Sequence, residues 1–145
     1  MILVDANVLI YAFRRDTDRH DDFRRWLETA IAEEPVLGVS ELILSTVVRI
    51  TTHSRIFARP STAGEAFGFA QFLLDQPNAV SVTPGRRHWS IFASLCRNTE
   101  ARGNLVTDAY LAALAIEAGA EWITTDRDFA RFSGLRWRHP LEPRS

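Results

Sequence analysis

Four acidic residues have types and positions that could support chemistry, because each follows an apolar strand-like run or begins a helix-like one. They are Asp5 after MILV, Glu41 after VLGVS, Asp108 at the head of DAYLAALAIEAG and Asp126 after WITT. In an open α/β sheet the carboxyl ends of the strands face one crevice, where ligands bind. Carboxylates gathered there repel one another unless a cation lies among them, and hard divalent cations prefer oxygen ligands. The four acids therefore predict a Mg²⁺ or Mn²⁺ site that acts on phosphate.

Each of these acids also has an ordinary structural explanation. Asp108 could cap its helix, and Glu41 could complement a helix dipole. Asp5 and Asp126 could be turn residues that follow strands. For one acid alone the ordinary explanation is favoured, but four acids at the same sheet edge favour a site.

The pattern of apolar residues predicts the elements that would position these acids. The expected strands are residues 2–4, 36–39, 79–82 and 122–125, with a short last strand at 135–138. The expected helices are residues 8–13, 21–34, 41–53, 62–76, 87–99 and 108–119. Strands separated by whole helices pair in parallel. We therefore expect one three-layer α/β/α domain over residues 1–145, with a central, mainly parallel sheet of four to five strands and a loose tail from about residue 139.

Composition places the chain among ordinary globular proteins. It has 145 residues, 46% of them hydrophobic and 24% charged, which is enough to bury a core within one domain. We find no apolar run of membrane-spanning length and no signal-peptide pattern at the N-terminus. One cysteine, Cys96, excludes a disulfide framework and is interpreted as core filling. A cytoplasmic location is expected.

All 17 basic residues are arginine, and the chain has no lysine. Mechanisms that need a lysine, such as Schiff-base chemistry and phosphate-binding loops, are therefore excluded. Arginine binds phosphate in a bidentate manner and stacks on bases, which suits contact with nucleic acid. A genome that favours arginine codons explains the bias equally well, and the sequence does not decide between the two.

The histidines do not form a metal site by spacing, so the predicted ligands are all oxygen. They are scattered along the chain at His20, His53, His88 and His139. Oxygen ligands favour Mg²⁺ or Mn²⁺ over zinc. Mg²⁺ lowers the pKa of its bound water and neutralises phosphate oxygens. Hydrolysis of this kind leaves a 5′-phosphate and a 3′-hydroxyl, whereas attack by a ribose 2′-hydroxyl leaves a cyclic phosphate.

Three segments together resemble a known family. MILVDANVLIYAF, VSELILS and TDAYLAALAIEAGAEWITTDRDF are similar to the motifs of PIN-domain ribonucleases, and more narrowly to the VapC-type toxins of bacterial VapBC toxin–antitoxin pairs. The resemblance covers nearly the whole chain. It implies a metal-dependent endoribonuclease with catalytic, metal-binding acids at Asp5, Glu41, Asp108 and Asp126. Asp128 matches a fifth acidic position that is common in the family.

Small polar residues lie beside these acids in the sequence. Asn7, Thr107 and Thr125 stand where they could orient the carboxylates or a metal-bound water. Asn7 could instead cap the first helix, and Thr107 could cap the helix that starts at Asp108. We favour a mixed role for Asn7 and leave the two threonines open.

The resemblance also implies partners. The substrate would be RNA, cut at a few sites in tRNA or rRNA, and the chain would form a homodimer and bind a small VapB-type antitoxin that covers the metal site. The helices that carry Phe23 and Trp26, or Phe67 and Phe72, offer apolar surface to an antitoxin, although Phe23 and Trp26 are better explained as core. The candidate RNA-binding residues are Arg14, Arg15, Arg49, Arg55, Arg59, Arg86, Arg87 and Arg127. A net charge of −1 argues against indiscriminate binding.

Other functions fit less well. An aspartyl-phosphate phosphatase needs an aspartate two residues after Asp5, where this chain has Asn7, and it also needs a lysine. Nucleases of this kind that act on DNA carry long insertions, and this compact chain has none. A non-catalytic, RNA-binding or scaffold PIN domain remains as the alternative, and metal-dependent cleavage would distinguish it.

Overall fold

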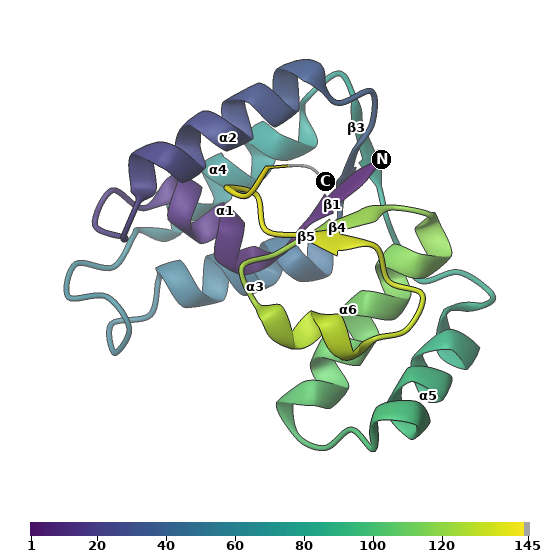
Figure 1. Cartoon of the computed structure of the whole chain (residues 1–145). Helices are drawn as coiled ribbons and strands as arrows, with labels where there is room; N and C mark the ends of the chain where they lie inside the picture. Colours follow the sequence, from purple (N-terminus) through teal and green to yellow (C-terminus); the bar gives the residue numbers. More distant parts are fainter. Residues whose placement is uncertain (144–145) are drawn as a thin grey trace.

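A five-stranded parallel sheet forms the centre of the protein. The structure is a computed structural model, which describes residues 1–143. The strands are β1 (Ile2–Val4), β2 (Leu37–Val39), β3 (Ala79–Ser81), β4 (Glu121–Ile123) and β5 (Trp137–Arg138). Their order is β3-β2-β1-β4-β5, and every neighbouring pair is parallel. The predicted sheet is therefore confirmed, with β1 at its centre (Figure 1).

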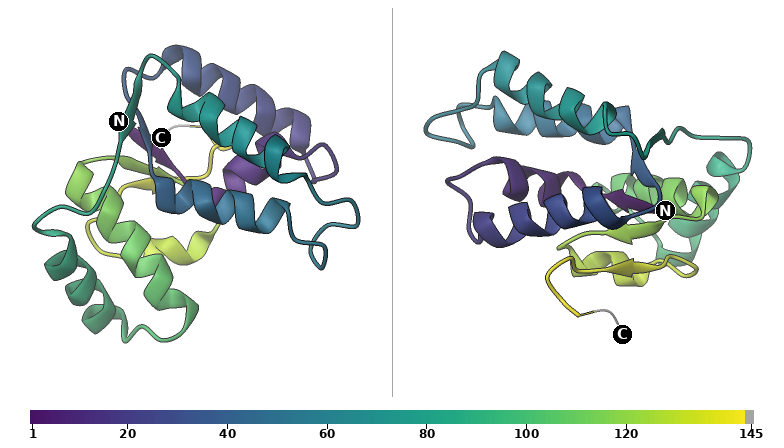
Figure 2. Two further views of the ribbon diagram at one scale, coloured as in Figure 1. Left: turned by 180° about the vertical axis from the view of Figure 1, so that it is seen from behind. Right: turned by 90° about the horizontal axis from the view of Figure 1, so that it is seen from above.

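Helices cover both faces of this sheet. They are α1 (Ala6–Phe13), α2 (His20–Glu33), α3 (Glu41–Thr51), α4 (Ala63–Leu74), α5 (His88–Thr99) and α6 (Asn104–Ala118), with a 3-10 helix η1 (Arg127–Arg131). Helix α1 contacts both α2 and α3, and α3 contacts α4. Helices α5 and α6 pack against each other as a separate pair (Figure 2). The three-layer α/β/α arrangement is confirmed. None of the helices within residues 1–143 is both long and apolar enough to cross a membrane.

The core sits on the central strands. Ile2, Leu3 and Val4 of β1 are all buried, because β1 has a strand on each side and helices on both faces. Trp122 and Ile123 of the adjacent β4 are fully buried. This burial explains why these strands read as continuous apolar runs in the sequence. The first polar residues after these two runs, Asp5 and Thr124, lie at the carboxyl edge of the sheet and are themselves buried.

Local signals set several helix ends as expected. The capping box of α4 is present: Thr62 Oγ1 accepts from the Glu65 backbone N–H at 3.1 Å, and Glu65 Oε1 accepts from the Thr62 backbone N–H at 3.0 Å. Gly119 ends α6 in the left-handed conformation with φ 67°. These ends depend on contacts within a few residues, so the sequence predicts them well.

The start of α6 was predicted wrongly. The helix begins at Asn104, a full turn before Asp108, and its N-cap residue is Gly103 with φ 57°. A glycine followed by an asparagine reads as a loop, which hid this first turn. Asp108 and Thr107 therefore lie inside the helix, and neither of them caps it. This removes the ordinary structural explanation for Asp108.

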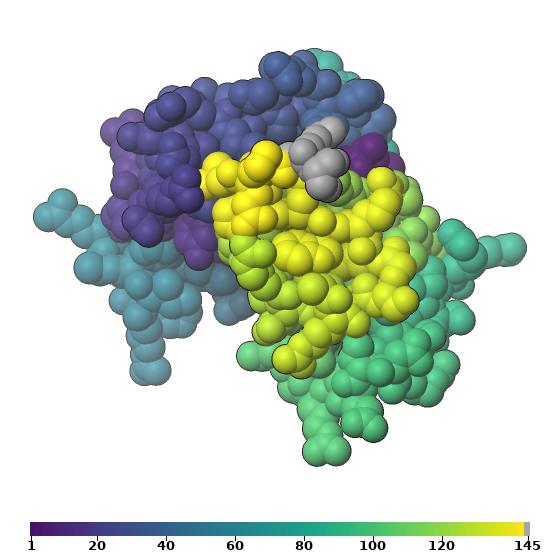
Figure 3. All heavy atoms as spheres, in the orientation of Figure 1, coloured from purple at the N-terminus to yellow at the C-terminus, as the bar shows by residue number. Residues whose placement is uncertain are grey.

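The last described residues pack against the protein, where the sequence predicted a loose tail from about residue 139. Pro140 is buried, Leu141 packs against the core, and the His139 ring lies 6.2 Å from the Phe23 ring of α2. Glu142 forms an ion pair with Arg127. Figure 3 shows this last segment lying against the body of the molecule. Residues 144–145 of the predicted tail lie outside the described residues.

Candidate functional site

Asp5 is the first residue after the central strand, and it is held from the neighbouring strand. Its side chain is buried, with 8% of the residue exposed. Its backbone N–H donates to the Ile123 carbonyl at 2.8 Å, and Thr124 Oγ1 donates to Asp5 Oδ2 at 2.7 Å. Thr124 Oγ1 also accepts from the Asp126 backbone N–H at 3.0 Å. One buried hydroxyl therefore links the acid after β1 to the acid after β4.

Three aspartates from distant parts of the chain act on one another electrostatically. The pKa of Asp5 is raised to about 6, mainly by burial and also by the charges of Asp108 and Asp126, while hydrogen bonds from Thr124 and the Ala6 backbone oppose the rise. The pKa of Asp108 is also raised to about 6, first by burial and then by the charges of Asp126 and another nearby aspartate. This mutual repulsion is relieved by a proton or by a cation among the carboxylates.

The fourth aspartate in this group is Asp128, which raises the pKa of Asp108. Its backbone N–H donates to Asp126 Oδ1 at 2.9 Å, so Asp126 caps the short helix η1. The ordinary explanation of Asp126 as a turn residue is thus correct for one of its oxygens. It does not exclude a site, because a carboxylate has a second oxygen and several lone pairs.

Glu41 is placed differently from the aspartates. It is the exposed first residue of α3, and it borders a groove between α3 and α4 that Phe67 also lines. The hydroxyl of Ser40, and not Glu41, caps α3 by accepting from the Ile43 backbone N–H at 3.4 Å. Within residues 1–143, no three acidic, histidine or cysteine side chains lie close enough together to hold an ion. The four carboxylates therefore do not meet within a few ångströms in this arrangement, where no cation offsets their repulsion, and their role as metal ligands stays a prediction.

The donor set nevertheless fits an oxygen-preferring cation. Asn7 Oδ1 is buried and has no hydrogen-bond partner among the described residues, which is unfavourable unless something else satisfies it. Asn7 does not cap α1, because Asp5 occupies the N-cap position. An unsatisfied amide oxygen two residues after a buried carboxylate is suited to a metal ion or to a metal-bound water.

The sequence from residue 2 to residue 135 matches the PIN domain family. The chain belongs to this family. Ribonuclease VapC43 of Mycobacterium tuberculosis is 42% identical to it over 142 residues, which is 98% of this chain and 97% of the relative. Ribonuclease VapC25 of the same species is 37% identical over 140 residues, or 97% of this chain and 99% of the relative. The family resemblance seen in the sequence, to the VapC-type ribonucleases among PIN domains, is confirmed.

A solved structure shows the same fold. One chain in the crystal structure of VapBC2 from Rickettsia felis, bound to a DNA fragment from its promoter, superposes on this PIN domain with a TM-score of 0.69. The sequence identity is 16%, and the match covers 96% of this chain and 98% of that chain. At this identity the likeness concerns the fold alone.

The threonine that contacts the acids of this PIN domain was missed in the sequence. Thr124 makes both hydrogen bonds described above, whereas the predicted Thr125 is its half-buried neighbour and Thr107 is exposed on α6. The strand register could have identified it: Val4 pairs with Ile123, so the next residues, Asp5 and Thr124, lie side by side.

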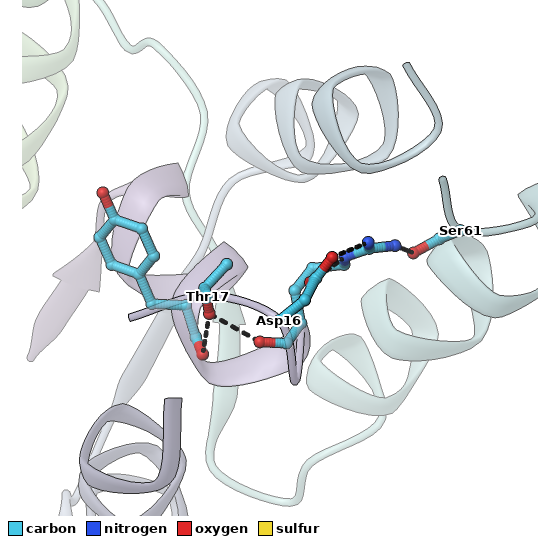
Figure 4. A network of polar contacts seen from close by, with 5 residues as sticks. Asp16, Thr17 and Ser61 are labelled. Carbon is cyan, nitrogen blue, oxygen red and sulfur yellow. Dashed lines mark hydrogen bonds and ion pairs between the residues drawn. The ribbon is translucent and has the colours of Figure 1, made fainter. Parts of the chain in front are cut away.

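Arg14 has structural contacts that an RNA ligand would have to replace, so its predicted role in RNA binding is not supported by its surroundings. It is 9% exposed, its guanidinium forms an ion pair with Asp16 at 2.5 Å and donates to Ser61 Oγ at 2.9 Å, and it lies 4.1 Å from the Phe57 ring centroid. Figure 4 shows this network from Asp16 to Ser61, with Thr17 beside it. These contacts attach the loop that precedes α4 to the end of α1.

The other predicted arginines lie at the surface of the PIN domain. Arg127 is exposed but forms an ion pair with Glu142, so binding RNA would require it to leave this partner. The remaining candidates are all exposed: Arg15, Arg49, Arg55, Arg59, Arg86 and Arg87. Their proposed role in RNA binding stays a prediction.

The aromatic residues on two helices divide as core and surface. Phe23 is buried and Trp26 packs partly buried against the core, which confirms the preferred explanation for α2. In contrast, Phe67 and Phe72 of α4 are 63% and 52% exposed. Cys96 packs partly buried against the core, as expected. Of these two helices, α4 and not α2 presents exposed aromatic side chains.

Proposed function

We propose that this chain is a metal-dependent endoribonuclease that acts as the toxin of a toxin–antitoxin pair. The observation that carries the proposal is the link from Asp5 to the Asp126 backbone through Thr124 Oγ1, with Asp108 near enough for its charge to raise the pKa of Asp5. It is supported by 42% identity to a protein named ribonuclease VapC43. The absence of lysine and the oxygen-only donor set agree with this chemistry.

A bound Mg²⁺ or Mn²⁺ would draw the carboxylates of Asp5, Asp108 and Asp126 closer together as its ligands, with Glu41 and Asp128 as further candidate carboxylates. When bound, such an ion lowers the pKa of a water molecule and neutralises the charge on phosphate oxygens. The buried Oδ1 of Asn7, which has no hydrogen-bond partner among residues 1–143, would accept a hydrogen bond from a metal-bound water at this centre.

The protein's own residues keep this centre in place. Thr124 fixes one oxygen of Asp5 and the backbone before Asp126, so that the acids after β1 and β4 keep a constant relation. Asp108 projects from the second turn of the long helix α6, which limits its movement. Rigid placement of this kind lowers the cost of bringing the reacting groups together.

RNA is the proposed substrate, and tRNA or rRNA the proposed class. Single-stranded loops suit recognition because their bases can be splayed out and read. The proposed protein partners are a VapB-type antitoxin and a second copy of the chain. The exposed Phe67 and Phe72 and the groove beside Glu41 offer an apolar surface for an antitoxin next to one of the proposed acids.

The test is incubation of the purified chain with total bacterial RNA in Mg²⁺, Mn²⁺ or EDTA, beside an Asp108→Asn variant, followed by mapping of new 5′ ends. We expect discrete ends that carry a 5′-phosphate, require the metal and disappear in the variant. Intact RNA that still binds to the chain would favour a non-catalytic, RNA-binding PIN domain. Cleavage that survives in the variant would show that the proposed site is wrong.

A further inference from the structure

Trp89, the second residue of α5, has the most exposed large hydrophobic side chain among residues 1–143, with 71% of the residue accessible. One side of its ring is supported, because it packs against Phe92 in an edge-to-face contact at 5.5 Å. Phe92 in turn contacts Tyr110 at 5.4 Å, and Tyr110 contacts His88 at 4.3 Å. The tryptophan ring is therefore held from behind by an aromatic cluster and is open to solvent in front.

The turn that leads into α5 is attached firmly to α6. The Glu117 carboxylate accepts from the Gly85 backbone N–H at 2.6 Å and from the Arg87 backbone N–H at 2.8 Å. The buried His88 ring places Nε2 3.0 Å from the Tyr110 carbonyl oxygen. Helix α5 packs against α6 (Figure 1), and α6 also carries Asp108. The same helix therefore positions both the start of α5 and one acid of the candidate centre.

The charge around Trp89 is positive. Between Asp75 and Glu100 the sequence has no acidic residue and three arginines, Arg86, Arg87 and Arg97, although the whole chain has a net charge of −1. Both Arg86 and Arg87 are exposed, and neither guanidinium forms an ion pair within residues 1–143. Glu117 uses its carboxylate on backbone N–H groups of this turn. Two unpaired arginines near an exposed aromatic ring in the sequence suit a ligand that carries both negative charges and planar aromatic rings.

We propose that Arg86, Arg87 and Trp89, together called the α5 platform, bind single-stranded RNA outside the metal centre. Trp89 stacks on a base, and the two guanidinium groups bind the phosphates on either side. A fixed ring loses little freedom on binding, and stacking accepts any base. This inference rests on the proposed function and adds a binding site to it. A protein partner is less suited, because one aromatic ring flanked by arginines is not a continuous apolar patch.

The test measures binding in an Asp108→Asn background, so that RNA is not consumed. Fluorescence anisotropy compares a short labelled single-stranded RNA of mixed sequence with an abasic ribose–phosphate oligomer of the same length. We expect Trp89→Ala to weaken RNA binding about 5- to 150-fold, the range for loss of one stacked base, and to leave binding of the abasic oligomer unchanged. Trp89→Phe should keep most of the affinity, because it retains an aromatic face.

A second variant separates charge from stacking. The double change Arg86→Gln and Arg87→Gln should weaken binding of both ligands. It should also reduce the slope of log K against log salt concentration by about 1.4, since each phosphate contact on a single strand contributes about 0.7. Val80→Ala is the control, because Val80 is an exposed apolar residue on β3 with 47% of the residue accessible, and its RNA affinity should equal that of the parent.

Two results would overturn the α5 platform while leaving the nuclease intact. One is cleavage by the unmodified chain together with equal RNA affinity of the folded Trp89→Ala and parent proteins. The other is unchanged RNA affinity with a loss of self-association in sedimentation, which would make Trp89 a contact between copies of the chain. Absence of both RNA binding and cleavage would instead reject the proposed function, and this inference with it.

Discussion

Replacing Asp5 with asparagine should stabilise the metal-free protein at neutral pH, although it removes a proposed ligand. Asp5 is buried, and its pKa is raised from 3.8 to about 6 mainly by that burial, with Asp108 and Asp126 adding repulsion. Its ionised form is therefore unfavourable in the native state. Asparagine has the same shape without the charge and can still accept the hydrogen bond from Thr124.

The size and the pH range of the effect follow from the raised pKa. A rise from 3.8 to about 6 corresponds to about 3 kcal/mol, at about 1.4 kcal/mol for each pKa unit. Between these two pKa values the native state keeps a proton that the unfolded state has released, so the stability of the natural chain falls as the pH rises. The advantage of Asp5→Asn should thus be absent below pH 3.8 and complete above about pH 6.

Urea unfolding in EDTA at a series of pH values measures this difference. The exposed Asp18→Asn is the matched control, and its free energy of unfolding should follow that of the natural chain. Adding Mg²⁺ should stabilise the natural chain and have little effect on Asp5→Asn, because a ligand stabilises only the state that binds it. A variant that is less stable than the natural chain at pH 7.5 in EDTA, or a difference that does not change with pH, would refute this reasoning.

Two other residues give further expectations. Thr124→Val removes the hydroxyl that joins Asp5 to Asp126, so cleavage of a mapped RNA should fall about 10- to 100-fold, the usual range for a residue that orients a metal ligand. Thr124→Ser should restore it, and a Thr124→Val enzyme with normal activity would contradict this role. Arg14→Gln removes a partly buried ion pair, a hydrogen bond to Ser61 and a cation–π contact and should lower the free energy of unfolding by about 1–3 kcal/mol in urea. The exposed Arg15→Gln should change stability by less than about 0.5 kcal/mol, and equal effects of the two would contradict the structural role of Arg14.

Much of the fold could be predicted because its signals are local. The buried central strands appear as continuous apolar runs, the Thr62–Glu65 capping box marks the start of α4, and Gly119 marks the end of α6. Each signal depends on residues within about one helical turn of each other. The prediction of where α6 begins was wrong for the same reason. Gly103 and Asn104 locally favour a loop, whereas packing against α5 and the sheet favours a helix.

The candidate site was predicted at the level of which acids could take part, and less well at the level of their partners. Parallel strands end at one edge, so the sequence placed Asp5 and Asp126 at the same edge, and the pairing of β1 with β4 then brought them near each other. The choice of Thr124 over Thr125 depends on register, because one step along a strand turns a side chain to the opposite face. The placement of Glu41 beside the α3–α4 groove depends on how a helix packs, which no short segment of sequence specifies.

The sequence by itself therefore determined the succession of strands and helices along the chain, the family, and the acids that follow the strands. These depend on periodicity, on the residues at element ends and on motifs, all of which are properties of neighbouring residues. Only the tertiary structure decided that Arg14 is fixed to Ser61, that Arg127 is paired with Glu142, and that Trp89 is exposed. Such facts depend on contacts between residues far apart in the chain, and charge or hydrophobicity at one position does not reveal them.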